Sequence, residues 1–74
     1  MKPKVEFRSN KITDTERVFV DKQLVGYTNP WEFNGVIFRA LPGKYLKTLE
    51  ILDEKRFKNH TELARMISRL IEKH

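Results

Sequence analysis

The stretch HTELARMISRLIEKH, residues 60–74, decides the fold of this chain. Its apolar side chains recur at the three- and four-residue spacing of an amphipathic helix, at Leu63, Met66, Ile67, Leu70 and Ile71. A helix of this length is stable in a small protein only when its apolar stripe is covered. We therefore expect the rest of the chain to form the surface that this helix packs on.

The first half of the chain predicts that surface to be an antiparallel sheet. Residues 2–8 alternate polar and apolar side chains, as a half-buried strand does, and a polar loop follows over residues 9–15. Residues 17–20 and 24–27 are rich in strand formers and flank a short polar connection, which predicts a hairpin. We expect Thr28-Asn29-Pro30 to break the second of these runs, because proline cannot donate to a strand ladder.

A second hairpin is predicted at Asn34-Gly35, because this dipeptide tolerates the positive φ angles of a tight turn. The strand after the turn covers residues 36–41. Before the turn, residues 31–33 either pair with that strand or continue the loop that follows Pro30.

The region between the sheet and the last helix is predicted to hold a shorter helix. Leucines at positions 46, 49 and 52 fall on one side of it together with Tyr45, although a strand over residues 45–51 is the alternative. Residues 55–59 are then a break, and Asn59 or Thr61 caps the last helix. The prediction is a single small α+β domain over residues 1–74, with a three- or four-stranded antiparallel sheet packed against one or two C-terminal helices.

Composition argues against a catalytic site. A chain of 74 residues leaves little room for a deep cavity, and it contains no cysteine. The two histidines, His60 and His74, are too few and too far apart for a metal site. We expect no enzyme activity, no cofactor, no metal and no small-molecule substrate.

The apolar runs are too short to cross a membrane, and the first residues lack the apolar centre of a signal peptide. Together with the absence of cysteine, this predicts a cytoplasmic protein with no membrane partner.

The formal net charge of +5 and the sequence pI near 9.8 favour a polyanionic partner, of which nucleic acid is the first to consider. The densest cluster is Lys55, Arg56 and Lys58 with His60, at the amino end of the last helix, where free amides also favour an anion. Arg65 and Arg69 form a second line on the helix itself. The alternative is that these side chains are solvated or pair with nearby glutamates.

The aromatic residues are numerous for so short a chain. We expect Phe19, Phe38 and Tyr45 in the core. Trp31 and Phe33 flank a proline and a turn, so we expect them to be partly exposed and able to anchor a protein partner.

The order of strands followed by LKTLEIL, residues 46–52, and Thr61-Glu62-Leu63-Ala64 resembles the opening of a winged-helix domain of the response-regulator type. That resemblance implies DNA binding, but no recognition helix or wing follows in these residues, so it assigns no DNA-reading residue. A second arrangement would lay one face of a small sheet in a DNA groove with a helix behind it, and would use Arg8, Arg17, Lys22 or Arg39.

These patterns lead to two hypotheses. The first is a small non-enzymatic nucleic-acid-binding or regulatory module that contacts phosphates through Lys55, Arg56, Lys58, His60, Arg65 and Arg69. The second is a protein-interaction module or small inhibitor that binds a partner protein through Trp31, Phe33 or a sheet edge, or that self-associates through apolar surface left over on a helix.

Overall fold

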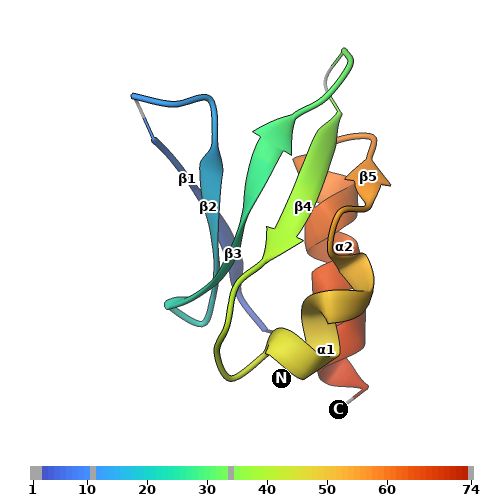
Figure 1. Cartoon of the computed structure of the whole chain (residues 1–74). Coiled ribbons are helices and arrows are strands. Elements are labelled where there is room, and N and C mark those ends of the chain that lie inside the picture. The colour runs from blue at the N-terminus through green and yellow to red at the C-terminus, as the bar shows by residue number, and fades with distance from the viewer. Residues whose placement is uncertain (1–2, 11, 34, 74) are drawn as a thin grey trace.

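The computed structural model describes residues 3–10, 12–33 and 35–73. Five strands form one sheet in the order in which they occur along the chain, and every neighbouring pair is antiparallel (Figure 1). The α+β class is confirmed, with one strand more than the expected maximum. The elements are β1 (Val5–Ser9), β2 (Glu16–Val20), β3 (Gln23–Pro30), β4 (Val36–Ala40), α1 (Leu46–Leu49), the 3-10 helix η1 (Glu50–Leu52), β5 (Arg56–Phe57) and α2 (His60–Glu72).

The predicted hairpin over residues 17–27 is confirmed as β2 and β3. Its turn residues, Asp21 and Lys22, have φ angles of 48° and 69°. Two positive φ angles give the turn a twist that matches the right-handed twist of the flanking strands. The register then shifts between Val18 and Phe19, which leaves one extra residue on β3.

The break expected over Thr28-Asn29-Pro30 is wrong, because β3 continues through these three residues and ends at Pro30, which pairs with Val36 of β4. Proline is tolerated there because the pairing of β3 with β2 ends at Thr28, so at Pro30 the strand has a neighbour on one side only, as an edge strand does. The next amide, on Trp31, donates to the Gly35 carbonyl over 2.8 Å and closes the loop. Trp31 and Phe33 belong to this loop and not to a strand, whereas Asn34 of the predicted turn lies outside the described residues.

The helix predicted after the sheet is confirmed over the alternative of a strand, but it is short. One α-helical turn, α1, leads directly into η1. The break expected over residues 55–59 is wrong in part, because Arg56 and Phe57 form β5. The backbone before β5 is already fixed to β4, with Glu54 N donating to the Phe38 carbonyl over 2.7 Å. Phe57 then enters the core opposite Val36, which stabilises this two-residue strand.

The core lies between one face of the sheet and the helices (Figure 1). Asn59 caps α2 as predicted, accepting the Glu62 amide over 2.9 Å. A Cβ on Gly26 would lie 2.7 Å from the Phe38 ring, so glycine at this position lets that ring pack close against β3. The buried apolar residues are Val18, Val20, Val25, Val36, Phe38, Leu49, Leu52, Phe57, Leu63 and Ile67.

Of the three aromatics expected inside, Phe38 is confirmed as fully buried. Tyr45 is half-buried at the margin of the core. The expectation that Phe19 lies in the core is wrong. Its cross-strand partners are Glu6 and Leu24, which places it on the opposite face of the sheet. Across the described ranges, no helix is long and apolar enough to cross a membrane.

Candidate functional site

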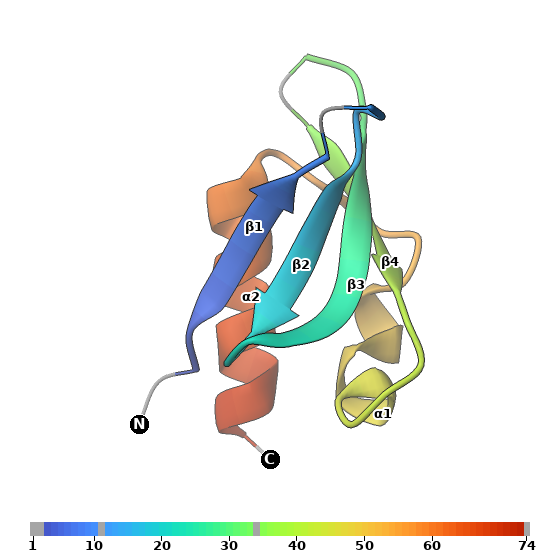
Figure 2. The same ribbon diagram turned by 90° about the vertical axis from the view of Figure 1, so that its left-hand side faces the viewer.

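The face of the sheet that turns away from α2 carries no helix in the part of the chain that the structure describes (Figure 2). Successive strand residues point to opposite faces, so the buried residues Val18, Thr28 and Phe38 fix which residues lie on this side. We call it the open face. It consists of Glu6, Arg8, Arg17, Phe19, Leu24, Tyr27, Asn29, Ile37, Arg39 and Arg56.

A row of basic residues crosses the open face from strand to strand. Arg8 of β1 is the direct partner of Arg17 of β2, which in turn faces Tyr27 of β3, and Tyr27 faces Arg39 of β4. Three cations therefore lie in one line perpendicular to the strands. Arg56 of β5 lies on the same face, beside Ile37.

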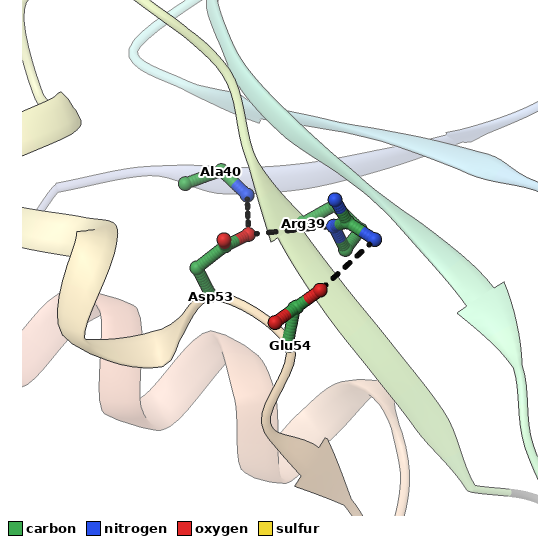
Figure 3. A network of polar contacts seen from close by, with 4 residues as sticks. All are labelled: Arg39, Ala40, Asp53 and Glu54. Carbon is green, nitrogen blue, oxygen red and sulfur yellow. Dashed lines mark hydrogen bonds and ion pairs between the residues drawn. The ribbon is translucent and has the colours of Figure 1, made fainter.

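Arg39 is the only one of these arginines that is held by carboxylates among the described residues. Its Nε lies 3.5 Å from Asp53 Oδ1 and its Nη1 lies 3.4 Å from Glu54 Oε1 (Figure 3). The same Asp53 oxygen accepts the Ala40 amide over 2.9 Å. Arg39 thus fastens the turn after η1 to β4, and its charge is largely balanced.

Arg8 and Arg56 each stack on an aromatic ring. The Arg8 guanidinium lies 4.5 Å from the centroid of the Phe19 ring, and that of Arg56 lies 4.0 Å from the centroid of the Trp31 ring. Such contacts orient the guanidinium plane and leave its N–H groups free to bind. The two stacked pairs lie toward opposite edges of the sheet, at β1–β2 and at β5.

One end of the open face is hollowed into a groove. Its lining joins Arg8, Arg17 and Phe19 to the loop after β1, where Ile12 is 93% exposed. The two cross-strand arginines therefore line a concave surface together with an aromatic ring.

The basic residues singled out in the sequence are divided by the fold. Arg56 lies on the open face, and Lys55 and Lys58 are exposed on either side of β5. His60 is different, because its Nε2 lies 2.7 Å from Glu16 Oε2 and its ring packs edge-on against Phe7. His60 therefore ties the start of α2 to β1 and β2.

Arg65 and Arg69 lie on α2, exposed, and line a separate groove with Thr61 and Glu62. Since α2 covers the other face of the sheet, these two arginines are not brought together with Arg56 (Figure 2).

Trp31 and Phe33 are exposed as expected, at 38% and 101%, but they do not form one surface. Trp31 joins Arg56 on the side of the open face. Phe33 lines a pocket with Asn59 and His60 at the start of α2.

Reasoning from the sequence placed Arg8, Arg17 and Arg39 on one sheet face only as an alternative arrangement, and it missed Phe19. The signal was present in the pattern of β2, because Val18 and Val20 alternate with Arg17 and Phe19. That alternation puts the two valines on one face and the arginine and phenylalanine on the other.

No group of three or more histidine, aspartate or glutamate side chains in the described ranges is arranged to hold a metal ion. Compared with protein-family models, curated proteins and solved structures, the chain gives no match.

Proposed function

We propose that this protein is a non-enzymatic nucleic-acid-binding module, of a regulatory kind, that contacts phosphates through the arginines of its open face. The observation that carries the proposal is that Arg8 and Arg17 lie directly opposite each other on β1 and β2, with Arg56 on the same face. In the described part of the chain, none of these three pairs with a carboxylate.

Like charges directly opposite on neighbouring strands destabilise a sheet. A polyanion relieves this repulsion, because its phosphates supply negative charge to two arginines that no carboxylate pairs with among the described residues. Arginine also suits the task, since its planar fork can bind phosphate oxygens in pairs. Both properties support a phosphate-binding role for the open face.

Two charge-matched double variants test the location of the site. Arg8→Gln with Arg17→Gln removes two charges from the open face, and Arg65→Gln with Arg69→Gln removes two from α2, so each lowers the formal net charge from +5 to +3. Fluorescence anisotropy with labelled DNA and RNA oligonucleotides at low salt measures the affinity of each.

We expect the open-face variant to lose about tenfold or more in affinity, since two hydrogen bonds to charged groups are removed. The α2 variant should lose only the smaller, general effect of reduced net charge. A larger loss of affinity in the α2 variant than in the open-face variant would mean that the site lies on the helix. No oligonucleotide binding by the wild-type protein at tens of micromolar would reject the proposed function.

A protein-interaction module is the second candidate, and the exposure of Phe33 favours it. Phe33 is exposed in the loop between β3 and β4, and Ile12 is exposed in the loop between β1 and β2. These two loops lie at the same end of the sheet (Figures 1 and 2). Exposed apolar side chains at one end of a molecule are typical of a contact surface. Size-exclusion chromatography with light scattering tests self-association: a dimer that Phe33→Ser dissociates would support it, and a monomer at all concentrations would exclude the homodimer.

A further inference from the structure

The width of the open face bears on the kind of nucleic acid that it fits, if the proposed function holds. Its arginines extend from β1 to β5, which are four strand spacings apart. At about 4.8 Å for each spacing, the face is about 19 Å across. The major groove of B-DNA is about 12 Å wide and admits a two-stranded ribbon. A sheet whose strands run along one groove therefore cannot place both Arg8 and Arg56 inside it.

A single strand has no such limit, because it can lie across the strands of a sheet with its bases turned toward the protein. The usual partners of unpaired bases are aromatic rings and the planes of arginine guanidinium groups. The open face offers this combination twice, at Arg8 on Phe19 and at Arg56 on Trp31. In each pair the guanidinium already lies over the ring, so a base stacking on it extends an existing stack.

The residues between the two stacked pairs suit the backbone of the same strand. Arg17 and Asn29 lie there on β2 and β3. Arg17 supplies a cation for a phosphate, and the Asn29 amide supplies both a donor and an acceptor. Three strand spacings, or about 14 Å, separate the strand of Phe19 from that of Arg56, which leaves room for nucleotides between the two stacked bases.

We propose that the open face binds single-stranded nucleic acid, with one unpaired base stacked at Arg8–Phe19 and another at Arg56–Trp31. The phosphates contact Arg17 and the free N–H groups of Arg8 and Arg56. Stacking of this kind tolerates any base, because every base has a π face. The proposal rests on the proposed function and adds to it the form of the ligand.

The experiment uses the intact protein with oligodeoxythymidine and oligouridine of about 12 nucleotides and a DNA duplex of about the same length, all within the usual range of site sizes. Anisotropy of the labelled oligonucleotide reports affinity. Trp31 is the only tryptophan in the chain, so its intrinsic fluorescence reports contact at one of the two stacked pairs. Both signals are recorded at the same low salt concentration.

We expect a single strand, of DNA or RNA, to bind at least about tenfold more tightly than the duplex and to quench Trp31, because only unpaired bases can stack. Trp31→Leu and Phe19→Leu should each weaken binding of the single strand by about 5-fold or more, because the guanidinium on which the base stacks loses the ring that supports it. About 5-fold is the lower end of the range for a base stacked directly on an aromatic ring. Phe33→Leu is the matched control. Phe33 is more exposed than Trp31, but it lines a pocket with His60 at the start of α2 and not the open face. The Phe33→Leu variant should therefore bind the single strand with the affinity of the wild type.

Circular dichroism tests whether each variant is folded. The quenching of Trp31 is measured in the wild-type protein, so this result holds even if a variant does not fold. Equal or tighter binding of the duplex, or unchanged Trp31 fluorescence at saturation, would overturn the single-strand proposal and leave the proposed function standing. Absence of binding to every oligonucleotide would reject both.

Discussion

Arg8 and Arg17 occupy positions where a stable sheet would ordinarily place opposite charges. Their Cα atoms are direct cross-strand partners, and the stacking of Arg8 on Phe19 does not neutralise either charge. By contrast, Arg39 in the same row is balanced by Asp53 and Glu54. The unbalanced pair is therefore a local loss of stability that a bound phosphate would recover.

Replacing Arg17 by threonine should make the free protein more stable and the complex weaker. Removing a like-charge pair and introducing a good strand former should raise the free energy of unfolding by about 0.2–1 kcal/mol. Urea denaturation at low salt measures this gain. The gain should shrink at high salt, where repulsion between exposed charges is screened. A loss of stability at low salt would mean that Arg17 is stabilised by its neighbours.

For single residues, burial could be predicted from the sequence where the neighbouring residues leave only one face of the strand or loop for the side chain. Phe38 is buried and Trp31 is exposed, as expected. Phe19 was misplaced because an aromatic in a strand was assumed to face the core. Hydrophobicity alone cannot make that assignment, since the valines at 18 and 20 already fill the core side of β2.

The first turn of α2 is the element that joins the helix to the sheet. His60 reaches Glu16 of β2, and its Nε2 also lies 3.4 Å from the hydroxyl of the buried Thr28 on β3. Ser9 donates to the other oxygen of Glu16 over 3.2 Å. Four elements are thereby connected through one small polar network. No local pattern of residues predicts it, because its members come from four separate parts of the chain.

Replacement of His60 by glutamine should reduce stability and leave nucleic-acid binding unchanged. The change removes a half-exposed pair with Glu16 and the edge contact with Phe7, together worth about 1–2 kcal/mol. Urea denaturation measures the loss, and Lys58→Gln, in the exposed connection just before α2, is the control for general effects of substitution. Weaker oligonucleotide binding with unchanged stability would instead make His60 the phosphate contact predicted from the sequence.

Among the elements, α2 and the hairpin of β2 and β3 could be predicted, because their periodicity and turn residues are local signals. β5 could not, since a strand of two residues has no period of its own. It forms because the turn after η1 bonds to β4 and directs Phe57 into the core. The extension of β3 through Pro30 was missed because proline excludes only a donor, and a strand residue with a neighbour on one side only can lack one.

For the molecule as a whole, the net charge of +5 predicts a partner that is sensitive to salt. The fold sharpens this expectation, because it divides the cations between the open face and α2. Only those that contact the nucleic acid release counterions from it. The slope of the logarithm of affinity against the logarithm of salt concentration therefore reports the number of phosphate contacts and not the total charge of the protein.

With Arg8, Arg17 and Arg56 in contact, the logarithm of the affinity for a single strand should fall with the logarithm of salt concentration at a slope of about −2, from about 0.7 for each contact. Anisotropy titrations at several salt concentrations give this slope. The Arg8→Gln, Arg17→Gln variant should bring it to about −0.7, since one contact remains. A slope unaffected by these substitutions would place the phosphate contacts elsewhere.

The order of the strands in the sheet has a kinetic consequence. Because β1 to β4 pair only with their neighbours along the chain, each of these pairings closes a short loop, which favours rapid assembly of a meander. The contact of α2 with β1 joins residues from opposite ends of the chain. The longest loop closure in folding is thus made in one event, the docking of α2, and until it occurs much of the apolar side of the meander remains in water.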